Sequence, residues 1–167
     1  MTISPPRVRS ARELLLDDLK RLLTVETTLA KVILPKLLQE VQDDELKSAL
    51  QQHHEETKQH VENVKNAFEE LGEDASGKDA PALDGLKEEH DSGIENVAPE
   101  LRDSFDAGSA IGTEHYEIAI YSTALLLAQS VGQQNVASFL RDNLDQEFVA
   151  LKKLETISER LAQGRAD

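Results

Sequence analysis

The sequence predicts an all-α protein: an antiparallel four-helix bundle with one long crossover that carries a short extra helix. Apolar residues recur every three or four positions along four long segments, and this spacing places them on one face of a helix. Leucine, alanine, glutamate and lysine are abundant, and glycine is scarce inside the segments, as is typical of helical proteins. The connections after the first and third segments are short, whereas the connection after the second is long.

The first predicted helix spans residues 10–41. It starts with the pattern Ser10, Glu13, a capping box in which the hydroxyl and the carboxylate bond to free backbone amides. Pro35 lies inside this segment, and we expect it to kink the helix because proline has no amide hydrogen to donate. Residues 1–9 are expected to be a flexible tail, and residues 10–163 a single domain.

The other long helices are predicted at residues 43–71, 99–131 and 134–161. Gly72 ends the second and Gly132 ends the third, because glycine readily adopts the left-handed conformation that follows a helix. The first and second helices are joined by only a few residues, and so are the third and fourth. Each of these pairs is therefore expected to form an antiparallel hairpin.

The crossover between the hairpins has a composition of its own. Residues 73–85 are rich in glycine, aspartate, alanine and serine and include Pro81, which indicates a linker. A short helix is expected at residues 86–97. Two hairpins joined by a long crossover form the ferritin-like arrangement of a four-helix bundle. The up-down-up-down alternative would need a short connection between the second and third helices.

Four glutamates occupy positions on the apolar stripes, each near the middle of its helix: Glu26, Glu56, Glu114 and Glu147. A buried carboxylate costs several kcal/mol unless it is paired, protonated or bound to a cation. One such residue alone more often reaches solvent or bonds to a neighbour. At about 1.5 Å per residue, similar spacings within the two hairpins place all four side chains in one layer. The joint pattern therefore predicts a site for multivalent cations.

Further metal-binding side chains share this layer. His60 follows Glu56 by four residues and Glu117 follows Glu114 by three, and both spacings keep the side chains on one helix face. His53 and Tyr121 are expected either to hydrogen-bond to the ligands from outside or to act as ligands. The six predicted ligands are Glu26, Glu56, His60, Glu114, Glu117 and Glu147.

Carboxylate and imidazole ligands without sulfur suit Fe or Mn, with Zn as a further candidate, and we predict two ions. The remaining histidines are not assigned to the site. His54 and His115 are expected at the surface because they fall on other helix faces, and His90 in the crossover is given no role.

Composition excludes several classes of function. The formal net charge of −14 argues against a nucleic-acid partner, because phosphate binding needs clustered basic residues. The chain has no cysteine, which excludes disulfides and thiolate ligands. No apolar run is long enough to span a bilayer, and residues 1–10 lack the apolar core of a signal peptide. A cytoplasmic protein is expected.

The same residues carry a resemblance to the YciF-like branch of the ferritin-like superfamily, a bacterial stress-associated group. The resemblance covers nearly the whole chain after the tail and implies a ferritin-like bundle, a di-metal centre and a homodimer. The stretches that carry it are Leu34-Pro35-Lys36, His53-His54-Glu55-Glu56-Thr57, Gly85-Leu86-Lys87-Glu88-Glu89, Glu114-His115-Tyr116-Glu117-Ile118-Ala119-Ile120-Tyr121 and Leu144-Asp145-Gln146-Glu147.

One departure from the wider superfamily concerns its Glu-x-x-His motif on two helices. Here Gln59 follows Glu56 by three residues, and Ala150 follows Glu147 by three. The site is thus richer in carboxylate and poorer in histidine than the usual di-iron pattern, which favours manganese or a weakly occupied site.

Two functions are compatible with these features. The first is a di-metal oxidoreductase, of ferroxidase or peroxidase type, that acts on peroxide, oxygen or Fe(II) in stress protection. The second is a non-catalytic, stress-associated bundle that sequesters metal or binds a partner. An iron-storage cage is a weaker option, because a cage needs specific contacts between subunits.

Overall fold

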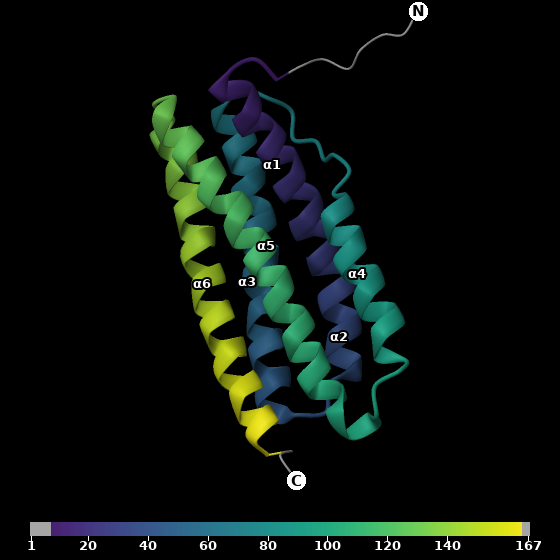
Figure 1. Cartoon of the computed structure of the whole chain (residues 1–167). Coiled ribbons are helices and arrows are strands. Elements are labelled where there is room, and N and C mark those ends of the chain that lie inside the picture. The colour runs from purple at the N-terminus through teal and green to yellow at the C-terminus, as the bar shows by residue number, and fades with distance from the viewer. Residues whose placement is uncertain (1–7, 165–167) are drawn as a thin grey trace, which may run out of the picture.

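The computed structural model describes residues 8–164, and all regular elements within this range are helices (Figure 1). None of these helices is long and apolar enough to cross a membrane. The predicted tail, residues 1–9, falls mostly outside the described residues. The elements are α1 (Ala11–Thr28), the π-helix η1 (Leu29–Ile33), α2 (Leu34–Glu40), α3 (Asp44–Glu70), α4 (Pro81–Ile94), the 3₁₀ turn η2 (Pro99–Leu101), α5 (Arg102–Ser130) and α6 (Gln134–Gln163).

The four long rods form the predicted ferritin-like bundle. One rod consists of α1, η1 and α2 in succession, and it packs against α3 and α5. Helix α6 packs against the same two helices from the other side. Helices α3 and α5 therefore lie diagonally across the bundle, and the chain between them returns along its length (Figure 1). The prediction of two hairpins joined by a long crossover is confirmed.

The helix ends follow the predicted capping residues. The Ser10 hydroxyl accepts a hydrogen bond from the Glu13 amide at 3.1 Å, although the Glu13 carboxylate accepts from the Arg9 amide rather than from that of Ser10. Gly72 and Gly132 end α3 and α5 with φ of 68° and 74°, in the left-handed region that favours glycine.

The crossover helix is longer than predicted and begins earlier. Helix α4 starts at Pro81, whereas the sequence indicated a linker up to residue 85 and a helix at 86–97. Proline suits the first helical turn because its φ is already helical and no amide hydrogen is needed there. The Asp84 amide closes that turn on the Ala80 carbonyl at 3.1 Å. The glycine-rich composition suggested a linker, but Gly85 is accommodated inside the helix.

The helix of the first rod widens into a π-helical turn, η1, just before Pro35. In η1 the Leu34 amide donates to the Leu29 carbonyl, five residues back. The Ala30 carbonyl would pair in the same register with residue 35, which as proline has no hydrogen to give. Instead, Nε2 of His54 lies 2.8 Å from the Ala30 oxygen. The prediction that His54 is a surface residue is wrong, because its half-buried ring bonds to a carbonyl that Pro35 leaves free.

We expect His54→Ala to destabilise the fold by about 1 kcal/mol, since it leaves a partly buried carbonyl without a donor. Urea denaturation of the metal-free protein measures this change. His115→Ala is the matched control, because His115 is exposed on α5 and its loss should leave stability unchanged. Equal stability of the two variants would show that water replaces the imidazole at no cost.

Candidate metal centre

Five of the six predicted ligands meet in a buried layer halfway along the bundle, and His53 joins them in place of Glu56. Helix α1 supplies Glu26, α3 supplies His53 and His60, α5 supplies Glu114 and Glu117, and α6 supplies Glu147; all six are at most 4 % exposed. These side chains point inward because each follows the helical spacing of its neighbours in the core. The layer places four carboxyl groups and two imidazoles in the middle of a mainly aliphatic core.

Two sets of ligand atoms form within this layer. In each set, one nitrogen or oxygen from every residue lies within 4.8 Å of the others. The first set consists of His53, Glu114, Glu117 and Glu147, and the second of Glu26, His60 and Glu147. Glu147 belongs to both sets, so its carboxylate is positioned to bridge two cations.

The two histidines present different nitrogens to the centre. Nε2 of His53 lies 3.1 Å from Oε1 of Glu114 and 3.8 Å from Oε2 of Glu147. Nδ1 of His60 lies 2.9 Å from Oε1 of Glu147 and 3.4 Å from Oε1 of Glu26. The opposite nitrogen of His60, Nε2, bonds to the side-chain oxygen of Gln146 at 2.8 Å. A donor hydrogen on Nε2 leaves Nδ1 available as a metal ligand.

A hydrogen-bonded chain supports the second set from one side. The Tyr121 hydroxyl donates to Oε1 of Glu26 and accepts from the Asn143 amide at 3.0 Å. The same amide lies 3.3 Å from the His60 carbonyl oxygen, and Asn63 donates to Oδ1 of Asn143 at 2.7 Å. These contacts fix the orientation of Glu26, which is the usual function of groups behind metal ligands.

Many polar atoms of the layer have no hydrogen-bond partner within the described chain. A buried polar atom without a partner costs about 1–3 kcal/mol, and native proteins contain few of them. Their concentration at one depth fits a pair of cations that the carboxylate oxygens and Nδ1 of His60 would ligate, whereas Nδ1 of His53 faces Glu56. The unpartnered atoms are Oε2 of Glu26, Nδ1 of His53, Nδ1 of His60, Oε2 of Glu114 and both carboxylate oxygens of Glu117 and Glu147.

The crowding of carboxyl groups changes their acidity. Burial, followed by the neighbouring carboxylates Glu147, Glu26 and Glu114, raises the pKa of Glu117 well above its usual value. Burial raises the pKa of Glu147 to about 7, against the opposing effect of His60. Burial alone would lower the pKa of His60, but Glu26 and Glu147 raise it to about 10. The metal-free centre therefore retains protons that cations would displace.

Glu56, predicted as a ligand, lies outside both sets. The buried stripe of α3 passes from His53 to Thr57 and then His60, which turns Glu56 toward the surface with 23 % of its side chain exposed. Its Oε1 accepts from Gln52 at 2.8 Å, and its Oε2 lies 3.7 Å from Nδ1 of His53. The structure instead brings His53 into the first set.

Sequence reasoning missed Gln146 and Gln52, the two amides behind His60 and Glu56. Both are exposed on α6 and α3, so hydropathy gave no signal for them. A search for polar residues one position from each predicted ligand would have included Gln146, because it precedes Glu147.

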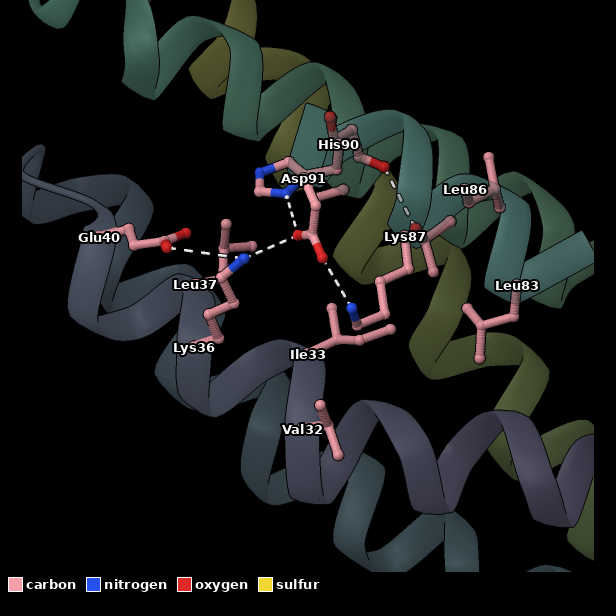
Figure 2. Close-up of a pocket in the computed structure, with 13 residues that line it drawn as sticks. Val32, Ile33, Lys36, Leu37, Glu40, Leu83, Leu86, Lys87, His90 and Asp91 are labelled. Atoms are coloured by element: carbon pink, nitrogen blue, oxygen red, sulfur yellow. Dashed lines mark hydrogen bonds and ion pairs between the residues drawn. The ribbon is translucent and has the colours of Figure 1, made fainter. Parts of the chain in front are cut away.

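A separate pocket of about 50 Å³ lies between α4 and the rod of η1 and α2, and it is lined by both aliphatic and polar side chains (Figure 2). Its charged groups pair with one another. Lys36 and Lys87 each contact Asp91 at 2.7 Å, and Nε2 of His90 contacts the buried Asp106 at 2.8 Å. His90 thus attaches the crossover helix to α5. The candidate functional site is therefore the carboxylate layer, where eight buried polar atoms have no hydrogen-bond partner within the described chain.

Comparisons with known proteins agree with the fold. The family model described as Domain of unknown function (DUF892) matches residues 10–167. Protein YciF of Escherichia coli (strain K12) is 30% identical over 136 residues, which are 80% of this chain and 82% of that protein.

Two solved structures superpose over most of the chain. One is described as YcfI, a putative structural protein from Rhodopseudomonas palustris, with 32% identity, a TM-score of 0.88, and coverage of 92% of this chain and 98% of that one. The other is the E. coli stress protein YciF, with 25% identity, a TM-score of 0.86, and coverage of 93% and 99%. The predicted resemblance to YciF is confirmed, and the chain belongs to the DUF892 family of ferritin-like helical bundles.

Proposed function

We propose that this protein binds two Fe or Mn ions between its four long helices and uses them in stress protection. Peroxide, oxygen or Fe(II) is the proposed substrate. The observation that carries the proposal is the position of Glu147, which belongs to two buried ligand sets. Every glutamate of these sets has at least one oxygen without a hydrogen-bond partner within the described chain. The paired carboxylates and imidazoles of ferritin-like di-metal proteins project into the bundle in the same way.

The first ion would be held by His53, Glu114, Glu117 and Glu147, and the second by Glu26, His60 and Glu147. A pair of Fe or Mn ions supplies redox chemistry toward oxygen or peroxide, whereas Zn would supply none. The donor set contains no sulfur and more oxygen than nitrogen, which supports Fe or Mn.

The chain's own residues contribute position, charge and shielding. Tyr121 holds the Glu26 carboxylate through its hydroxyl, and Gln146 holds His60 so that Nδ1 faces the centre. The aliphatic side chains above and below the layer exclude bulk water. This strengthens every electrostatic interaction inside it.

The proposed role in stress protection is supported by a relative, and the expected absence of a nucleic-acid partner is supported by the net charge of the chain. A protein 25–30% identical to this chain is described as an E. coli stress protein, and we extend that role to this protein. We also propose a cytoplasmic homodimer. The net charge of −14 supports our expectation that nucleic acid is not a partner.

The decisive experiment adds Fe(II) to the metal-free protein without oxygen, followed by air or hydrogen peroxide. We expect two Fe(II) ions per chain to bind and then to oxidise faster than free Fe(II), seen as ultraviolet absorbance of a ferric pair. Repeated additions should oxidise repeatedly. Protein loaded with Zn(II) is the control and should show no change. Binding of two ions without repeated oxidation would instead support metal sequestration, and absence of binding would contradict both functions.

A further inference from the structure

A small hollow on the surface leads toward the buried centre. It lies between α3 and α6, has a volume of about 10 Å³, and is lined by Gln52, His53, Glu56, Val149 and Lys153 with four aliphatic neighbours. The hollow reaches His53, a member of the first ligand set. It therefore lies where an ion could pass from solvent to the centre.

A row of polar contacts crosses this hollow from solvent to the ligands. Nζ of Lys153 donates to Oε1 of Gln52 at 2.7 Å, and Gln52 donates to Oε1 of Glu56 at 2.8 Å. Oε2 of Glu56 faces Nδ1 of His53 at 3.7 Å. On the far side of the same ring, Nε2 of His53 lies 3.1 Å from Glu114.

Glu56 differs from the ligands in its exposure. The six residues of the two ligand sets are at most 4 % exposed, whereas 23 % of the Glu56 side chain reaches solvent. One of its oxygens is held by Gln52 and the other faces Nδ1 of His53, an atom that has no hydrogen-bond partner within the described chain. A carboxylate and an unpartnered imidazole nitrogen are both suitable ligands for a divalent cation.

We propose that divalent cations enter and leave the centre through this hollow, with Glu56 as the carboxylate that captures the ion and passes it to His53. The proposal rests on the metal-binding function proposed above. Glu56 is then a residue of the entry path and not a permanent ligand, which accounts for its position outside both sets.

Gln52 and Lys153 close the entry path. A volume of about 10 Å³ is barely enough for one water molecule, so a hydrated ion cannot pass until these two side chains move. The positive charge of Lys153 at the mouth also repels an approaching cation. Carboxylate-lined clefts raise the association rates of cations by factors of ten or more, and Glu56 is placed to act in this way.

Mn(II) uptake and release by the whole chain test the proposal. Metal-free protein is mixed with Mn(II), quenched with excess EDTA at set times, desalted and analysed for bound metal. Release is followed by diluting loaded protein into EDTA, and equilibrium titration gives the dissociation constant. The variants are Glu56→Gln and Lys153→Ala. Their matched controls are Glu55→Gln and Lys152→Ala, which carry the same charge changes at adjacent exposed positions outside the hollow.

An entry residue must alter uptake and release together. We expect Glu56→Gln to slow both by about tenfold, with two ions still bound and little change in the dissociation constant. Lys153→Ala should accelerate both, and the two controls should match the wild type.

Equal rates in Glu56→Gln and Glu55→Gln would overturn the proposal. A Glu56→Gln protein that binds one ion fewer would also overturn it, because Glu56 would then be a ligand. Faster release at an unchanged uptake rate would overturn it as well, because Glu56 would then only support His53. A wild-type protein that binds no Mn(II) would contradict the proposed function itself.

Discussion

Replacing Glu147 by glutamine is expected to abolish binding of both metal ions while the bundle stays folded. Glu147 contributes one oxygen toward His60 and the other toward His53, and it is the residue common to the two ligand sets. Glutamine keeps the size of the side chain but loses the charge that a bridging ligand needs. Loss of a residue behind a ligand typically weakens binding 10- to 100-fold, and loss of a shared ligand should cost more.

The metal-free Glu147→Gln protein should be as stable as the wild type at neutral pH, or more stable. The substitution removes one of four crowded carboxyl groups, which outnumber the two imidazoles of the layer, and buried charge in excess of its partners opposes folding. Glu155→Gln is the control, since Glu155 lies on the same helix and is partly exposed. Metal analysis by mass spectrometry after Mn(II) loading should give two ions per chain in the control. Equal metal content in Glu147→Gln and Glu155→Gln would show that Glu147 is not a ligand shared by two ions.

The metal-free protein is expected to lose stability as the pH rises from about 5 to 10. The pKa values of Glu26 and Glu117 are raised by burial, and that of Glu147 is raised from 4.5 to about 7. Such groups bind more protons in the folded state. Their contribution is complete below about pH 4.5 and is lost as the pH rises through the folded pKa. For Glu147 alone the loss is about 3 kcal/mol.

His60 extends the same trend to higher pH. Burial opposes its charged form, but the adjacent carboxylates raise its pKa from 6.5 to about 10. Its stabilising contribution is therefore complete below pH 6.5 and is lost toward pH 10. Urea denaturation at a series of pH values should show the free energy of unfolding falling throughout this range.

Bound metal should reverse this dependence. Cations displace the extra protons, so protein loaded with Mn(II) should gain stability from the ligand and should bind it more tightly as the pH rises. A metal-free protein whose stability is flat between pH 5 and 9, and whose melting temperature does not change with Mn(II), would show that solvent or internal pairing satisfies the glutamates.

The fold could be predicted from the sequence because local and global signals agree. The helical spacing, the glycines at two helix ends and the unequal connections all indicate one topology, and the structure has it. The predicted start of α4 was wrong because the average composition of this stretch and the conformational preference of one residue in it point to different structures. Residues 73–85 resemble a linker on average, but Pro81 has the particular conformation that a first helical turn requires.

Most residues of the candidate site could be predicted from the sequence, but the sequence did not determine whether His53 or Glu56 faces inward. Buried carboxylates on apolar stripes identified the layer, because a charged residue in a core position needs a partner. His53 and Glu56 lie three residues apart, and either could face inward at that spacing. Only the packing of α3 against its neighbours determines that Thr57 and His53 turn inward and that Glu56 reaches the surface.

His54 illustrates a limit of a different kind. Its bond to the Ala30 carbonyl depends on a π-helical turn and on the antiparallel register of two helices. Pro35 indicated a local disturbance of the first rod, but the residue that compensates for it lies on another helix. Long-range contacts of this type leave no periodic signal in the sequence.

A Mn(II) titration of the metal-free protein, followed by electron paramagnetic resonance, distinguishes a di-metal centre from single or separate metal sites. We expect two ions per chain and a spin-coupled signal, because one carboxylate, that of Glu147, belongs to both ligand sets. Binding of a single ion, two uncoupled ions, or no ion at all would contradict a di-metal centre in this bundle.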